Sequence, residues 1–310
     1  MQVTLLPMIP FRHISRTWGK VCSLYIPCIF RPLVYGIYIK AFGVEMTEAI
    51  PSDMRCYKNL GELFRRRIDM KLRPVDSSAQ IVSPVDGRVL YSGLLCDGRV
   101  EQLKGMSYSV QQLMGPLRDT NAPPSSSTEY VDRVLMSKRN KLFTCTIYLA
   151  PGDYHRFHSP VSWTVLHRRH FAGELLSVNP RMLSWFPQLF VTNERVVLSG
   201  RWRHGFFSFT AVGATNVGSI VVYHDKCSTT RIDTNPPPPQ MLTTNQPNLK
   251  VGSYVDHSYG DGVSFSEGEA LGEFRFGSTV VLIYEAPANA DIFCSADEII
   301  KCGQKVSCKC

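Results

Sequence analysis

The sequence predicts an α+β fold, in which a β-rich domain follows a helical, basic N-terminal segment. Short apolar runs rich in β-branched and aromatic residues recur between residues 81 and 284, and their length is typical of strands. The first 50 residues instead mix aromatic and aliphatic side chains with scattered cations, which is typical of short amphipathic helices. At 310 residues, 44% of them hydrophobic, the chain can bury a core and is neither disordered nor collagen-like. We divide it into residues 1–50 and one domain over residues 51–310.

Positive charge is concentrated in the N-terminal segment of a chain whose net charge is +8. No acidic residue precedes Glu45, whereas the same stretch contains Arg12, Arg16, Lys20, Arg31 and Lys40. Such a bias suits an anionic partner, either membrane lipid or nucleic acid. The cations are interleaved with Leu, Ile, Phe, Tyr and Trp and follow no nucleic-acid-reading pattern, so we favour an anionic membrane and no nucleic acid.

The N-terminal segment is predicted to lie in the membrane interface without crossing the bilayer. Pro27, Pro32 and the cations interrupt it, so no uncharged apolar run approaches the roughly 20 residues that a spanning helix needs. Two alternatives stay open. The helices could pack on the core, or the arginine-rich, acid-free stretch could be a mitochondrial import signal, although it contains few serines for one.

The ten cysteines are scattered through a chain that is too long to need a disulfide framework, so we expect reduced thiols. The C-terminal group is the exception, because Cys302, Cys308 and Cys310 lie close together and Cys-Lys-Cys could bind a soft metal or oxidise. Our interpretation of this end is an untethered terminus.

The elements of the domain can be predicted in order along the chain. Residues 60–67 read Leu-Gly-Glu-Leu-Phe-Arg-Arg-Arg, which indicates a short amphipathic helix with a basic end. Strands are predicted at 81–82 and 88–91, joined by the turn Ser-Pro-Val-Asp-Gly at 83–87. By itself, Asp86 is interpreted as a turn residue. Further strands are predicted at 143–150, 195–198, 206–212 and 219–223.

Two polar, proline-rich stretches interrupt this pattern, at residues 119–128 and 235–248. Segments of strand character continue on both sides of each stretch. We therefore predict surface excursions from one domain and no boundary between domains. No repeat of the solenoid type is present in the sequence.

Two histidines follow the strand predicted at 143–150. Pro151 and Gly152 end that strand, so His155 and His158 are expected on a loop or short turn at a sheet edge. A helical turn would bring the two imidazoles together, as a zinc site requires, but His167, His170, His204 and His224 have no motif that fixes a third ligand. The alternative is acid and base chemistry, and spacing does not assign a role to either histidine.

The stretch Gly277-Ser278-Thr279 separates a half-buried strand predicted at 273–276 from a buried one at 280–284. Glycine permits unusual backbone conformations and leaves its carbonyl open to attack by the hydroxyl that follows it. That hydroxyl is only a latent nucleophile until a base removes its proton, a role that a histidine near Ser278 could fill. A plain tight turn explains the same three residues.

Six motifs occur in order along the chain: Ser-Pro-Val-Asp-Gly-Arg at 83–88, Leu-Ala-Pro-Gly-Asp-Tyr-His-Arg-Phe-His-Ser-Pro at 149–160, Ser-Val-Asn-Pro at 177–180, Asn-Glu-Arg-Val at 193–196, Val-Gly-Ala-Thr-Asn-Val-Gly-Ser-Ile at 212–220, and Leu-Gly-Glu-Phe-Arg-Phe-Gly-Ser-Thr at 271–279. Together they resemble the phosphatidylserine decarboxylase family in its mitochondrial type. The resemblance runs from about residue 18 to residue 287. Beyond Pro287 the chain follows the family poorly, and Phe276 replaces the family's usual leucine.

The resemblance implies a proenzyme that cuts itself between Gly277 and Ser278. The products are a chain of residues 1–277 and a chain of residues 278–310, which stay associated, and Ser278 becomes a covalent pyruvoyl group. By motif position, Asp86, His158 and Ser278 match the self-processing triad of the family. His155 matches the histidine of the decarboxylation step, and Ser177 matches a substrate-binding serine near the pyruvoyl group.

The activity implied is conversion of phosphatidylserine to phosphatidylethanolamine and CO₂ through a Schiff base, at the mitochondrial inner membrane. The pyruvoyl ketone would be the only cofactor, without metal or pyridoxal phosphate. Two alternatives from other classes are a zinc hydrolase using His155 and His158, and a non-catalytic module like a lipoyl or biotinyl domain, which predicts one intact chain. A homo-oligomer is compatible with the sequence, which does not set the oligomeric state.

Overall fold

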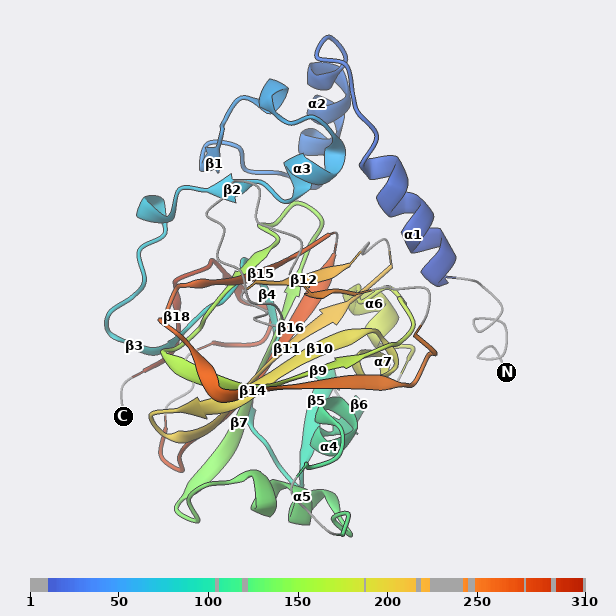
Figure 1. Cartoon of the computed structure of the whole chain (residues 1–310). Coiled ribbons are helices and arrows are strands. Elements are labelled where there is room, and N and C mark those ends of the chain that lie inside the picture. The colour runs from blue at the N-terminus through green and yellow to red at the C-terminus, as the bar shows by residue number, and fades with distance from the viewer. Residues whose placement is uncertain are drawn as a thin grey trace.

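The computed structural model describes residues 11–103, 106–118, 122–186, 188–215, 219–223, 242–244, 249–275, 277–290 and 294–308. Short helices at the N-terminal end precede a domain built mainly of antiparallel strands (Figure 1). The predicted α+β class is therefore confirmed. None of the helices in these residues combines the length and the apolar character needed to span a bilayer.

The N-terminal elements form a small layer at the top of Figure 1. They are α1 (Phe11–Cys22), α2 (Arg31–Phe42), β1 (Ala49–Ile50), α3 (Leu60–Phe64) and β2 (Arg67–Ile68), with 3₁₀ turns at Met54–Cys56 and Met70–Leu72. α2 ends at Gly43, whose φ of 65° is the left-handed conformation that closes a helix. Tyr35 is fully buried in this layer, and its hydroxyl donates to the Tyr57 carbonyl at 3.0 Å.

The main sheet has eight strands in the order β14-β9-β10-β11-β16-β7-β4-β17, all antiparallel. Their bounds are β4 (Gly87–Leu94), β7 (Asn140–Leu149), β9 (Trp163–Phe171), β10 (Arg195–Trp202), β11 (Gly205–Gly213), β14 (Tyr254–Phe265), β16 (Ser278–Pro287) and β17 (Ile299–Ile300). The predicted strands at 88–91, 143–150, 195–198, 206–212 and 280–284 are thus confirmed.

A second sheet of four strands packs on one face of the first. Its order is β13-β12-β15-β8, with β8 (Arg156–His158), β12 (Ile220–Val222), β13 (Leu242–Thr243) and β15 (Ala270–Phe274). The main core lies between the two sheets, where Phe157 of β8 stacks on Phe209 of β11 at 5.2 Å between ring centroids. The strand predicted at 273–276 is confirmed only for Glu273 and Phe274, which end β15, and Phe276 lies outside the described residues. These two residues are buried and not half-buried, because Glu273 is enclosed in ion pairs.

A second core cluster covers the opposite face of the main sheet. It is closed by the hairpin of β5 (Arg99–Leu103) and β6 (Met106–Ser109) and by α4 (Val110–Met114), α5 (Ser127–Val134), α6 (Pro180–Leu183) and α7 (Leu189–Thr192). Strand β16 contributes to both clusters. Val280 and Leu282 belong to the first cluster and Val281 and Ile283 to the second, which explains why this strand is apolar at every position.

The two proline-rich stretches are only partly within the described residues. The end of the first enters α5, whose Ser126 cap accepts from the Glu129 amide. Most of the second lies outside the described residues, although β13 falls within it and pairs with β12. That stretch is therefore not purely a linker.

The interpretation of the C-terminal end as untethered is wrong for residues up to 308. Strand β18 (Lys305–Cys308) pairs with β3 (Ala79–Val82), the strand predicted at 81–82, and Cys302 is buried with 2% of its surface exposed. Backbone pairing and burial hold this end against the domain, and Cys310 lies outside the described residues.

We predict that Phe157→Ala lowers the free energy of unfolding by about 3–5 kcal/mol, because it opens a cavity between the two sheets. Denaturant unfolding followed by fluorescence measures the loss. Val255→Ala, at a position with 45% of its surface exposed, should change stability by less than about 0.5 kcal/mol. An equal effect of both substitutions would show that Phe157 does not join the sheets.

Candidate active site

Ser278 is the first residue of β16 and lies between two neighbouring strands. It pairs with Leu149 at the end of β7 and with Gly213 at the end of β11. Its hydroxyl is fully buried and has no hydrogen-bond partner among the described residues. Side chains alternate along a strand, so Ser278 is on the same side as Val280 and Leu282, which face the smaller sheet. Seven other buried hydroxyls of the described residues are also unpaired, so Ser278 is distinguished by its position in the Gly-Ser-Thr motif together with this unpaired state.

Gly277 contributes space and not an unusual backbone conformation. Its φ is not among the left-handed ones, and a Cβ at this position would meet no atom of the described residues within 4 Å. The chain here is not a hairpin turn, since β15 and β16 belong to different sheets. The peptide bond before Ser278 therefore lies in the segment that connects the two sheets, and no described side chain fills the space beside Gly277.

The segment that carries both histidines is extended and not helical. β8 comprises Arg156–His158, and residues three apart on an extended chain point to opposite sides. The side chains of His155 and His158 therefore do not form a metal-binding pair. Within the part of the chain that the structure describes, no group of three or more His, Cys, Asp or Glu side chains is placed to hold a metal ion.

His155 is buried with a free ring nitrogen. Its Nδ1 donates to the Asp153 carbonyl at 2.8 Å, so Nε2 carries the lone pair, and Nε2 has no partner among the described residues. The ring packs on Phe64 of α3, with 3.9 Å between ring centroids. Burial, helped by the charge of Arg66, lowers the pKa of His155 to about 3. His155 is thus a neutral imidazole with an available base atom.

His155 and Ser278 belong to two segments that run alongside each other. Leu149 pairs with Ser278, and six residues later the His155 carbonyl accepts from the Phe274 amide at 2.8 Å. His155 shares a side of the extended chain with Phe157, whose ring lies in the core between the sheets. Nε2 of His155 and Oγ of Ser278 are thus two buried, unpaired polar atoms on segments whose backbones are hydrogen-bonded near both residues.

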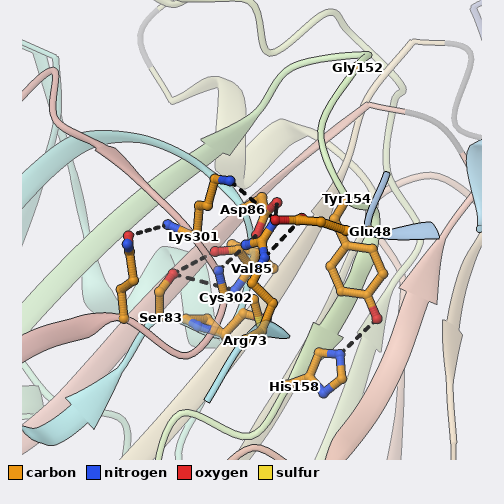
Figure 2. A network of polar contacts seen from close by, with 12 residues as sticks. Glu48, Arg73, Ser83, Val85, Asp86, Gly152, Tyr154, His158, Lys301 and Cys302 are labelled. Carbon is orange, nitrogen blue, oxygen red and sulfur yellow. Dashed lines mark hydrogen bonds and ion pairs between the residues drawn. The ribbon is translucent and has the colours of Figure 1, made fainter. Parts of the chain in front are cut away.

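His158 is held by different partners on the other side of the segment. Its Nδ1 donates to the Gly268 carbonyl at 2.9 Å, and its Nε2 accepts from the Tyr154 hydroxyl at 2.9 Å (Figure 2). Burial lowers the pKa of His158, while the charge of Asp86 partly opposes that shift. No hydrogen bond joins Asp86 to His158, so the carboxylate acts on this imidazole through its field.

Asp86 is bound by an arginine that sequence reasoning missed. Both of its carboxylate oxygens accept from Arg73, at 2.8 and 3.0 Å, and one also accepts from the Cys302 amide at 2.7 Å (Figure 2). Arg73 also pairs with Glu48. The buried guanidinium thus joins the N-terminal layer, the turn of Asp86 and the C-terminal end, and no spacing in the sequence indicates such a contact.

The histidine loop is held from above by the N-terminal layer. Tyr38 of α2 donates to the Pro151 carbonyl at 2.7 Å, and Arg66 donates to the Gly152 carbonyl at 3.0 Å. A Cβ on Gly152 would come within 2.0 Å of the Phe42 carbonyl, so only glycine fits here. The basic end predicted for the helix at 60–67 has this second role: α3 stops at Phe64, and Arg66 is buried against the loop, whereas Arg67 is exposed.

Ser177 lies in the loop between β9 and α6, near the strand end that pairs with Ser278. Its hydroxyl accepts from the Asn179 amide at 3.4 Å, and the side chain is half-buried. The neighbouring Leu176 amide donates to the Asn193 side chain, which in turn donates to the Gly213 carbonyl at 2.8 Å. Asn193 therefore fastens the loop of Ser177 to the strand next to Ser278.

Comparison with known proteins identifies the family. The family model described as "Phosphatidylserine decarboxylase" matches residues 60–308. The chain belongs to this family. The match extends past Pro287, so the expectation that the C-terminal end departs from the family is wrong.

Several curated relatives are named mitochondrial proenzymes of phosphatidylserine decarboxylase. The protein of Cricetulus griseus is 46% identical over 312 residues, covering 98% of this chain and 73% of the relative. Proenzyme 1 of Schizosaccharomyces pombe is 36% identical over 371 residues, covering 98% of this chain and 80% of the relative. Proenzyme 1 of Saccharomyces cerevisiae is 34% identical over 365 residues, covering 96% and 72%. Phosphatidylserine decarboxylases are carboxy-lyases, so the chain is a member of an enzyme family.

The low pKa of His155 predicts a pH dependence of stability. Below about pH 6.5 the unfolded chain protonates this histidine, whereas the folded chain stays neutral down to about pH 3. The unfolded state then binds more protons, so the free energy of unfolding falls as pH falls across this window. His155→Gln removes the group, and the fall with pH should become shallower by up to about 1.4 kcal/mol per pH unit.

Both proteins should carry Ser278→Ala, so that each is a single covalent chain, and urea unfolding at about pH 7 and about pH 4 measures the slopes. Carboxylates that titrate in this range contribute equally to both. Parallel slopes would mean that His155 is not buried in its neutral form.

Proposed function

We propose that this chain is a self-processing phosphatidylserine decarboxylase that converts phosphatidylserine to phosphatidylethanolamine and CO₂. The observation that carries the proposal is the buried, unpaired hydroxyl of Ser278 in the family's Gly-Ser-Thr motif, beside open space at Gly277. The Ser278 hydroxyl forms no hydrogen bond with its described neighbours. It is suited instead to attack the carbonyl that precedes it.

Self-cleavage begins when a base takes the Ser278 proton and the oxygen attacks the Gly277 carbonyl. The peptide bond is replaced by an ester, and the Ser278 nitrogen becomes a free amine. Loss of the Cα proton then expels the Gly277 carboxylate and leaves a dehydroalanine at residue 278. Tautomerisation and addition of one water release ammonia and leave a ketone. The balance is one water consumed, one ammonia released and one backbone bond broken.

We assign Asp86, His158 and Ser278 to this step and His155 to decarboxylation. The support for His158 as the base is that its hydrogen bond to the Gly268 carbonyl, and to a smaller extent the charge of Asp86, raise its pKa against the effect of burial. Its Nε2 must exchange the Tyr154 hydroxyl for that of Ser278 before it can act. Asp86 is held in place by two hydrogen bonds from Arg73.

The pyruvoyl ketone at residue 278 would supply the electron sink for the loss of CO₂ from a primary amine substrate. The residues around Ser278 fit such a group, because Gly277 leaves room and the core side chains exclude water. The ammonium of phosphatidylserine must lose protons to react with a ketone. The neutral Nε2 of His155 can accept one and return it to the carbon that CO₂ leaves. We place the serine headgroup near Ser177 on the basis of the family motif.

We further propose that the N-terminal layer binds an anionic membrane. Eleven large hydrophobic side chains are exposed between residues 14 and 42: Ile14, Trp18, Val21, Leu24, Tyr25, Ile29, Phe30, Leu33, Val34, Ile37 and Phe42. Exposed apolar groups at this density, interleaved with cations, support interfacial binding. The relatives are named mitochondrial, and we extend that location to this chain, at the inner membrane. Copies of the chain could also pair there, as the sequence allows.

The cleavage is predicted to give two fragments on intact-mass analysis of the purified protein. They comprise residues 1–277 and 278–310, and the smaller should lack an amine terminus and react with a carbonyl reagent such as a hydrazide. Ser278→Ala should leave one chain without decarboxylase activity. A wild-type protein that stays intact, yet folds, would contradict the proposal.

Variants of the other residues test the division of roles. Asp86→Ala and His158→Ala should remain uncut, whereas His155→Ala should be cut and then lose decarboxylation by at least about a hundredfold. Tyr154→Phe frees Nε2 of His158 and should be cut at least as fast as wild type. An uncut His155→Ala protein would reverse the assignment of the two histidines.

Membrane binding can be tested without removing the layer that holds the histidine loop. Leu33→Glu with Ile37→Glu replaces two side chains that are 66% and 64% exposed on α2, and should weaken binding to vesicles of phosphatidylserine and phosphatidylcholine by more than about tenfold. The matched control is Val255→Glu with Ile299→Glu, exposed on the domain. Equal sedimentation of both double variants with the vesicles would disprove the role of α2.

A further inference from the structure

A cavity of about 400 Å³ lies between α1, α3 and the segment that follows β15. Four of its lining residues are cations, Arg16 and Lys20 from α1, Arg65 after α3, and Arg275 after β15. The remaining lining is small or weakly polar: Gly19, Cys22, Ser23 and Gly61. The cavity thus gathers positive charge from three separate segments of the chain, next to small residues that leave room for a ligand.

Arg275 is the least compensated of these cations. Its side chain is half-buried, and its Nε atom has no hydrogen-bond partner among the described residues. No carboxylate of the described residues forms an ion pair with it. Its backbone is fixed, because the amide donates to the Ser219 carbonyl at 3.0 Å. Burial and the charge of Arg65 lower the pKa of Arg275, which shows that its charge is incompletely stabilised by the protein.

The nearest acidic group does not balance the cluster. Glu273 accepts from Arg65 at 2.8 Å, and its other oxygen is 3.7 Å from Arg156 and accepts from Tyr223. The Glu273 carboxylate is therefore already shared by the guanidiniums of Arg65 and Arg156, and it does not form an ion pair with Arg275. An anion in the cavity would supply the missing charge and would give the free Nε an acceptor.

We propose that this cavity binds the phosphodiester of the phospholipid substrate, with Arg275 as the principal contact and Arg65 beside it. This inference rests on the proposed function. Guanidinium groups bind phosphate oxygens through paired, charge-assisted hydrogen bonds, and a partly buried site strengthens them. Arg16 and Lys20 close the cavity from α1 and add to its positive field.

The position of the cavity suits that role. Two residues separate Arg275 from Ser278, so the backbone between them spans at most about 11 Å, which an arginine side chain and a serine headgroup together can bridge. On its other side the cavity is bounded by α1, whose Ile14 and Val21 are exposed to solvent. A lipid whose acyl chains stay with the exposed face of α1 would thus present its phosphate to Arg275 and its amine to residue 278.

The test compares the KM and kcat of wild type and variants for short-chain phosphatidylserine as substrate. This lipid is used below the concentration at which it forms micelles, so that membrane binding plays no part. Arg275→Gln should be cut like wild type, since Arg275 has no described partner to lose, and its KM should rise at least about tenfold with a smaller change in kcat. Arg275→Lys should recover part of the loss. Arg201→Gln, at an exposed position on β10, is the matched control and should behave like wild type.

A binding measurement distinguishes a lipid phosphodiester from inorganic phosphate as the ligand. It also distinguishes failure of the cavity inference from failure of the proposed decarboxylase function. Glycerophosphoethanolamine should bind wild type by calorimetry and inhibit it, ethanolamine should do neither, and Arg275→Gln should lose the binding. Unchanged KM and unchanged binding in Arg275→Gln would overturn the inference. Inorganic phosphate binding as tightly as glycerophosphoethanolamine would overturn the assignment to the substrate. A wild-type protein that is cut but has no decarboxylase activity would instead refute the proposed function. The calorimetry would still show whether the cavity binds the phosphodiester.

Discussion

The pairing of Ser278 with Leu149 is the interaction on which the site depends. Leu149 ends a strand, and the loop that carries the histidines follows it immediately, so this backbone register ties the start of β16 to the start of that loop. The register is strongly determined, because β16 is buried on both faces and a shift by one residue would exchange its two sets of core side chains. Core packing thus sets the position of a chemical group that itself contributes nothing to packing.

The loop beside Ser278 is held from both sides. The domain fixes it through β7 and β8, and the N-terminal layer fixes it through Tyr38 and Arg66. The layer that exposes many apolar side chains is therefore the same layer that packs on the histidine loop. Because burial keeps His155 neutral, the folded protein does not have to bury a charged imidazole in the absence of substrate.

Sequence reasoning could predict the strands and Ser278, because alternation, apolar runs and motif order are local signals. It could not predict how the histidines face, since the helical or extended state of residues 154–158 is decided by pairing of β8 with β15. It also missed Arg73, which pairs with the more distant Glu48 and Asp86, and Arg275, whose Nε has no partner among the described residues. The bond from Tyr154 to His158 is local but depends on the extended backbone. The C-terminal end appeared untethered because no residue pattern encodes its anchors, which are the pairing of β18 with β3 and the hydrogen bond from the Cys302 amide to the Asp86 carboxylate.

The central claim is that the Ser278 oxygen attacks the Gly277 carbonyl, and trapping the resulting ester tests it most directly. A slowly processed precursor should be incubated with and without hydroxylamine, and both chains then identified by mass. The account predicts a hydroxamate on Gly277 and an ordinary serine at the start of the smaller chain with hydroxylamine, and a carboxylate and a ketone without it. A smaller chain that begins with unmodified serine in the absence of hydroxylamine would contradict it, because plain hydrolysis would then explain the cut.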